Sequence, residues 1–167
     1  MPTSVIEGFL YSWKKNQDYA PKLVADLSEE QMVAQPATDP DAPANHPAWV
    51  FSHLNVYLPV ICSIIRGEAF EDPKTHRFGM LSKPEVSRDV YPSKQELLDV
   101  FLEGHDQVAT LLTGADDSVL ANAVQLPRWQ EIMPTAAIAL PYLMFNHENL
   151  HLGQLSAWRR VQGLPSV

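Results

Sequence analysis

Two histidines placed four residues apart, His147 and His151, could bind one metal ion. On an α-helix, side chains at this spacing project from one face about a turn apart. Both belong to an apolar stripe at helical spacing. Its members are Leu140, Leu143, Met144, His147, His151, Leu155 and Trp158. The phase of the stripe predicts that both imidazoles point into the core.

His53 is the third candidate ligand. It falls in a second helical stripe, formed with Trp49, Val50, Tyr57 and Val60. Burying neutral imidazoles is costly unless their nitrogens find partners, and a divalent ion held by three of them satisfies one nitrogen of each. The other nitrogens should then donate to carboxylates or carbonyls. The sequence therefore predicts an open metal site on His53, His147 and His151, for zinc, nickel, iron, manganese or copper.

The remaining histidines offer alternatives to this set. His46 lies seven residues before His53, on the same helix face, and we expect it at the helix start or at the rim of a pocket. His105 lies between apolar residues of its own helix and is interpreted as a core histidine with satisfied nitrogens. His76 is expected to be solvated. The competing interpretation of the triad is that its members are core residues without a metal.

The sequence offers no evident protein nucleophile or general base for such a site. Cys62 lies in an apolar run, and a buried apolar cysteine is more often inert than reactive. Glu148 adjoins His147 and is therefore turned about 100° around the helix. We expect Glu148 to support a ligand or to lie on the surface rather than to transfer protons.

Four segments with helical periodicity must position these residues, and no strand-like alternation competes with them. The first runs from Thr3 or Ser4 to about residue 25, and the second over about residues 45–66. The third runs from residue 93 to a stop at Gly114, and the fourth over about residues 135–162. Capping boxes at Ser93 and, for one short turn, at Ser28 support this division. The pattern predicts an all-α four-helix bundle in one domain spanning residues 1–167.

Two connectors stand out between these segments. Residues 35–47 hold prolines at 36, 40, 43 and 47 and cannot continue a helix. Residues 68–92 form a long loop between the second and third helices. A loop of this length in a compact domain is usually functional, so we expect a lid over one end of the fold.

Composition excludes several classes of function. The chain has 167 residues and a formal net charge of −8, which gives no electrostatic footprint for nucleic acid. No run approaches the roughly 18 uninterrupted apolar residues of a membrane span. The only cysteine is Cys62, so no internal disulfide is expected, and the first residues do not resemble a signal peptide. A reduced, cytoplasmic protein is the resulting prediction.

Two segments resemble the DinB-like (YfiT-like) metalloenzyme family. One is NHPAWVFSHL, residues 45–54, and the other is HENLHLGQL, residues 147–155, which is followed by Arg159-Arg160 and a Gly-Leu-Pro run at 163–165. The likeness covers almost the whole chain. It implies a four-helix bundle, commonly a homodimer, with a divalent metal on three histidines that correspond to His53, His147 and His151.

The resemblance also suggests roles for two further residues. It supports Gly153 as a small residue that allows close helix approach. Gln154 is expected to orient a water or a neighbouring chain, or to make a plain surface hydrogen bond. Phe9, Trp13 and Trp158 are compatible with a subunit interface, although core packing explains them as easily.

Three hypotheses for function follow. Family members with assigned chemistry are mostly thiol-dependent transferases and isomerases, which implies a metalloenzyme that activates a low-molecular-weight thiol for attack on a small electrophile. The first alternative is a small-molecule hydrolase with water as the nucleophile. The second is a non-catalytic binding or sensor protein. In each case residues 68–92 and the connector around Trp129 are expected to select the small molecule.

Overall fold

The computed structural model describes residues 4–36 and 43–167, and the regular secondary structure in this part of the chain is helical apart from one isolated bridge between Ala123 and Thr135. The α-helices are α1 (Val5–Tyr19), α2 (Pro47–Arg66), α3 (Lys94–Leu112), α4 (Pro127–Gln130), α5 (Ala136–Pro141) and α6 (Glu148–Val161). The all-α prediction is confirmed for these residues. Thr3, as a helix start, and Pro40, within the first connector, lie outside them.

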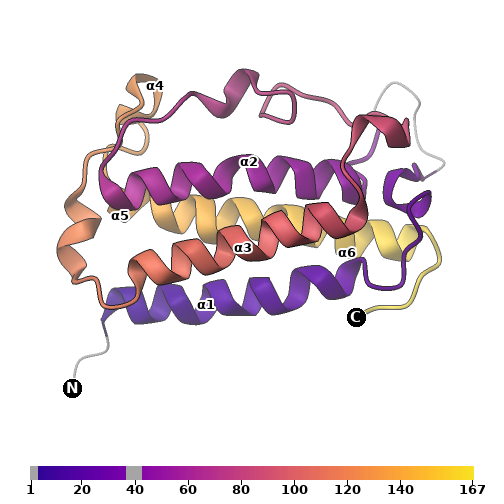
Figure 1. Cartoon of the computed structure of the whole chain (residues 1–167), viewed down its shortest axis with the longest axis horizontal. Coiled ribbons are helices and arrows are strands. Elements are labelled where there is room, and N and C mark those ends of the chain that lie inside the picture. Colours follow the sequence, from indigo (N-terminus) through magenta and orange to yellow (C-terminus); the bar gives the residue numbers. More distant parts are fainter. Residues whose placement is uncertain (1–3, 37–42) are drawn as a thin grey trace.

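The long helices lie alongside one another, with the α5–α6 run forming one of them (Figure 1). Helix α2 is central, since it packs most extensively against α3 and also contacts α5 and α6. Helix α1 covers α3. Trp13 and Trp158 are buried and Phe9 packs against the same core, so packing within one chain accounts for all three.

Local signals set the helix starts as expected. Ser4 and Ser93 each form a capping box, with Glu7 and Glu96 respectively. Helix α2 begins after His46, whose side chain accepts the amide hydrogen of Trp49, and has Pro47 in its first turn. It ends at Gly67, which adopts the left-handed conformation with φ of 69°.

The first helix is shorter than predicted. Helix α1 ends at Tyr19, and the chain continues as a 3₁₀ turn, η1 (Ala20–Leu23). The reason is Pro21, which has no amide hydrogen and cannot extend the α-helical ladder. The short turn expected after Ser28 is present as η2 (Gln31–Val33), and the Ser28 and Gln31 side chains accept hydrogen bonds from each other's backbone amides.

The last predicted helix contains a change of helical type. A π-helical segment, η6 (Tyr142–His147), lies between α5 and α6. It begins directly after Pro141, where the absent amide hydrogen interrupts the α-helical bonding. His147 is the last residue of this segment and His151 lies one turn into α6. Single π-helical turns inside α-helices occur frequently at functional sites.

Residues 68–92 run back along α2 and do not cover one end of the fold, contrary to the lid prediction (Figure 1). They contain two 3₁₀ turns, η3 (Pro73–Thr75) and η4 (Arg88–Val90). The segment is fixed to α2 by side chains of the helix and of its N-cap residue. The indole of Trp49 donates to the Ser82 hydroxyl at 3.1 Å, and Nε2 of His46 lies 2.8 Å from the Glu85 carbonyl oxygen.

The glycine that permits close helix packing is Gly104 rather than Gly153. A Cβ at Gly104 on α3 would lie 2.5 Å from Cδ1 of Leu58 on α2, so these helices approach too closely for a side chain there. A Cβ at Gly153 would meet no atom of the described chain within 4 Å. The predicted packing role of Gly153 is therefore wrong within this chain.

Helix α2 is the one described helix that is long and apolar enough to cross a membrane by length and composition. In its most apolar window, 78% of the residues are buried inside the molecule. This burial is typical of a core helix and is consistent with a soluble protein.

Candidate metal centre

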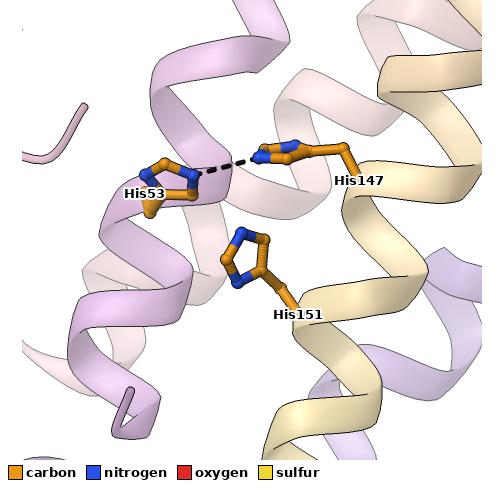
Figure 2. Close-up of side chains that lie close together, drawn as sticks. All are labelled: His53, His147 and His151. Atoms are coloured by element: carbon orange, nitrogen blue, oxygen red, sulfur yellow. Dashed lines mark hydrogen bonds between the residues drawn. The ribbon is translucent and has the colours of Figure 1, made fainter. Parts of the chain in front are cut away.

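The three predicted ligands lie together. His53 projects from α2 toward His147 and His151, which come from η6 and α6 (Figure 2). Their candidate ligand atoms all lie within 4.8 Å of one another. Nε2 of His53 and Nε2 of His147 are 3.0 Å apart. Three imidazoles on two neighbouring helical runs therefore converge on one point and could hold a metal ion.

Two of the rings are held so that Nε2 faces this point. Nδ1 of His53 lies 2.6 Å from the carbonyl oxygen of Phe78, which can only accept, so Nδ1 carries the hydrogen. Nδ1 of His151 lies 2.9 Å from Oε1 of Gln154 and donates in the same way. Each ring thus directs the lone pair of Nε2 toward the shared point, where that of His53 also lies 3.0 Å from Nε2 of His147, and this orientation is the one that supports metal-binding histidines.

Gln154 has a definite role that the sequence left open. Its Oε1 accepts from Nδ1 of His151 and also from Nδ2 of Asn45, at 3.0 Å. With Oε1 as the shared acceptor, the hydrogen lies on Nδ1 of His151. Gln154 therefore orients a candidate ligand within its own chain instead of a neighbouring chain or a surface contact.

Burial keeps the three imidazoles neutral. Desolvation, with the neighbouring histidines adding to it, lowers the pKa of His53 to about 4 and that of His147 to about 3. Burial also lowers the pKa of His151, and the hydrogen bond to Gln154 opposes this shift. All three rings are therefore unprotonated at neutral pH, the form in which histidine binds metals.

A cavity of about 530 Å³ opens from the triad. Trp49 stacks on His53, with ring centroids 4.7 Å apart, and Tyr57 contacts both His53 and His147. Other lining residues are Met80 from the 68–92 segment, Trp129 from α4, and Met133, Ile138, Tyr142 and Leu143. The two connectors expected to select a small molecule thus both contribute to this cavity, and its walls are mainly apolar.

The charged groups that line the cavity are few. Arg128 is a lining residue, and its guanidinium donates two hydrogen bonds to the Asp72 carboxylate, at 2.5 and 2.6 Å. Among the described residues that line the cavity, none is an aspartate or a glutamate. Within this part of the chain, the cavity therefore presents three neutral imidazoles and no carboxylate beside them.

The other histidines do not join the triad. His46 uses both ring nitrogens, at the helix start and on Glu85, as expected for a helix-start residue. His105 is buried against Trp13, as expected for a core histidine, but only Nε2 has a partner and Nδ1 is left without one. His76 is exposed, as predicted, and its Nδ1 accepts from the Phe78 amide.

Glu148 differs from expectation, because it neither supports a triad histidine nor lies on the surface. It is 2% exposed, and its Oε2 lies 3.1 Å from Nε2 of His105. Burial raises the pKa of Glu148, although His105 and Asn16 act in the opposite direction. The sequence H-E-x-x-H thus does not place a carboxylate beside the two histidines, because the glutamate points toward α3 instead.

The amino-acid sequence can also be compared with those of known protein families. The sequence matches the DinB superfamily over residues 12–155, which include all three histidines. The chain belongs to the DinB superfamily. A comparison with curated protein sequences gives no significant match. The family resemblance drawn from residues 45–54 and 147–155 is therefore confirmed.

Proposed function

We propose that this DinB superfamily protein is a divalent-metal-dependent enzyme that activates a low-molecular-weight thiol for transfer to a small electrophile. His53, His147 and His151 would hold the ion. The observation that carries the proposal is that three neutral imidazoles open onto an apolar cavity. Zinc, nickel, iron and manganese are all compatible with imidazole ligands.

The triad fits an ion with an open coordination position. His53 and His151 each have Nδ1 committed to an acceptor, so a lone pair of each ring faces the shared point. When bound there, a divalent ion supplies the charge that lowers the pKa of a thiol and stabilises the thiolate. A nucleophile brought in by a cosubstrate would explain why the protein needs none of its own.

The protein's own residues exclude water and position the reactants. Trp49 and Tyr57 pack against the triad and Trp129 closes another wall of the cavity. Burial raises the pKa of Tyr57, so its hydroxyl keeps its proton and can donate a hydrogen bond. An electrophile with an apolar body would fit these walls, and the Tyr57 hydroxyl would stabilise negative charge that develops on it.

The alternatives have weaker support. A hydrolase needs a general base near the attacking water, and Glu148 points away to His105. Cys62 cannot replace the cosubstrate thiol, because it is buried in the core and burial raises the pKa of its thiol. A non-catalytic binding protein would share the same cavity and differs only in the absence of turnover.

The test uses the zinc-, nickel- or manganese-loaded protein with 2-mercaptoethanol, cysteine or glutathione and the electrophile 1-chloro-2,4-dinitrobenzene. In the reaction a carbon–sulfur bond forms, chloride leaves and the thiol proton passes to solvent. We expect turnover with at least one thiol that falls by about 100-fold in His151→Ala and is unchanged in Cys62→Ala. No acceleration over metal ion alone with any thiol would favour the binding protein.

We further propose that the helices form the family's four-helix bundle, with residues 68–92 as its long connection and with one domain spanning residues 1–167. By the same family argument the protein would be a homodimer, and the cysteine content and N-terminal sequence support the proposal that it is cytoplasmic. Sedimentation equilibrium tests the assembly, since a mass near 18.7 kDa at all concentrations contradicts the dimer and twice that mass supports it.

A further inference from the structure

A second cavity of about 970 Å³ lies between α2, α3 and residues 68–92. None of the three candidate metal ligands lines it, so it is distinct from the metal centre. Its size falls within the usual range of small-molecule sites. The cavity can therefore hold a small molecule that takes no part in the proposed thiol chemistry.

Two polar atoms in the α2 wall of this cavity have no partner. Ser52 is 4% exposed, and its hydroxyl makes no hydrogen bond. Oδ1 of Asn55 is likewise buried without a donor, although the Nδ2 of Asn55 donates to the Leu97 carbonyl. Buried polar atoms are normally hydrogen-bonded, so each such exception calls for a partner. Oδ1 of Asn55 can only accept, and the Ser52 hydroxyl can accept as well as donate, so a ligand that donates hydrogen bonds can pair with both oxygens.

The backbone of α2 contributes a further acceptor near these two side chains. Pro59 lies in the same wall, inside α2. Since proline has no amide hydrogen, the carbonyl of Asn55 receives no helical hydrogen bond from residue 59. This carbonyl therefore lies within about one turn of the unpartnered Ser52 and Asn55 oxygens.

Charge favours a cation at the same place. Glu71 and Glu96 are exposed lining residues, and no lysine or arginine occurs among the described residues that line the cavity. Asp72 also lines it but is paired with Arg128. The remaining walls are largely apolar, with Val56, Val60, Phe70, Leu97 and Val100 among them.

We propose that this cavity binds a small organic ammonium ion, a primary amine with an apolar body. An ammonium group has three donors and no acceptor, which complements a wall of unpartnered oxygens. The negative charges of Glu71 and Glu96 attract it, although Oε2 of Glu96 also accepts hydrogen bonds from Ser93, and the apolar walls bury its body. The amine site is independent of the thiol chemistry and stands if the metal centre proves to have another function.

The probe is benzylammonium, compared with the neutral benzyl alcohol and the anionic benzoate, which share its ring. Binding to the full-length protein is followed by two-dimensional amide NMR at ligand concentrations up to about 10 mM, where affinities of the expected order are measurable. We expect saturable shifts around Ser52, Asn55 and Leu97 with benzylammonium, and at least tenfold weaker binding of the other two compounds.

Four variants separate the amine site from a merely underpacked cavity. Val100→Trp fills the cavity from an exposed position and should abolish binding, and Ser52→Ala should weaken it severalfold. Glu71→Gln should also weaken binding severalfold, whereas Glu103→Gln, an exposed control outside the lining, should not. The amide spectra report whether each variant is folded.

Equal binding of all three compounds, unchanged binding in folded Val100→Trp, or no saturable binding of benzylammonium would each overturn the proposal. Unchanged binding in Ser52→Ala would overturn it as well, because the unpartnered hydroxyl would then have no role in recognition. None of these outcomes depends on metal or thiol, so they are distinguishable from failure of the proposed enzyme activity.

Discussion

Two of the three candidate ligands, His53 and His151, have their other ring nitrogen occupied. A buried histidine with both nitrogens free could turn or exchange tautomers, whereas an acceptor at Nδ1 fixes both properties. For His53 that acceptor is the backbone of Phe78, and for His151 it is the side chain of Gln154. These two contacts supply the orientation that distinguishes a preorganised site from a cluster of core histidines.

Gln154→Ala tests the orientation of His151 directly. Loss of the Oε1 acceptor frees the hydrogen on Nδ1, and we expect metal affinity to fall by about 10- to 100-fold. Asn149→Ala, an exposed change on the same helix, is the matched control and should bind metal like the native protein. Competition titration with a chromogenic zinc chelator measures both. Equal affinities in the two variants would show that Gln154 does not support the site.

A second residue-scale prediction concerns Arg159, whose side chain is 1% exposed. It donates to both oxygens of Asp26, at 2.6 and 2.8 Å, and to the carbonyls of Leu23 and Pro165. The guanidinium beside Asp26 holds the pKa of that carboxyl below its usual value. The pair therefore stabilises the fold above the unfolded pKa of about 3.9 and ceases to do so as pH falls through the lower, folded value.

Asp26→Asn should accordingly lower the free energy of unfolding at pH 7 by about 1–2 kcal/mol, a modest figure because Asp26 is itself half-exposed. The difference from the native protein should shrink steadily as the pH falls below about 4. Urea denaturation at several pH values measures it. A difference that stays constant down to pH 2 would mean that charge is not the source of the stabilisation.

At the scale of elements, the sequence predicted the starts of helices better than their interiors. Capping residues such as Ser93 act locally, and so does His46 with Pro47, so the positions of these helix starts could be inferred. Pro21 was a readable signal for the early end of α1. The π-helical segment at Tyr142–His147 was not readable, because Pro141 alone permits a bend, a break or a wider turn, and packing decides among them.

The difference between local signals and tertiary packing also explains which site residues could be predicted from the sequence. The triad followed from helical phase, a property of each helix alone. The Phe78 carbonyl has no side-chain signature, and the direction of Glu148 depends on the position of α3, from which His105 meets it. The partners of the ligands, unlike the ligands themselves, required the tertiary structure.

The two helix glycines give a prediction at this scale. Gly104→Ala should destabilise the protein by about 1–3 kcal/mol, because its Cβ would overlap Leu58 on the neighbouring helix. Gly153→Ala should stabilise it by up to about 1 kcal/mol, because alanine favours a helix and nothing in the described chain obstructs it. Thermal unfolding of both variants measures the contrast. Destabilisation by Gly153→Ala would indicate that a second copy packs on that face.

At the scale of the whole molecule, residues 68–92 connect two cavities. Phe78 lines the 970 Å³ cavity, and its carbonyl oxygen accepts from His53 of the triad. Asp72 also lines that cavity, and its partner Arg128 lines the 530 Å³ cavity beside the triad. The segment is therefore a shared wall rather than a lid over one end.

The central claim, a metal centre on three histidines, is tested most directly by metal content per chain. The protein would be purified without a metal-binding tag, incubated with zinc, nickel or manganese, and measured by elemental analysis beside His53→Ala, His147→Ala and the exposed control His76→Ala. We expect about one equivalent in the native protein and in His76→Ala, and loss of the metal from the two triad variants with the helical content preserved. No metal in the native protein, or equal metal in all four proteins, would contradict the claim.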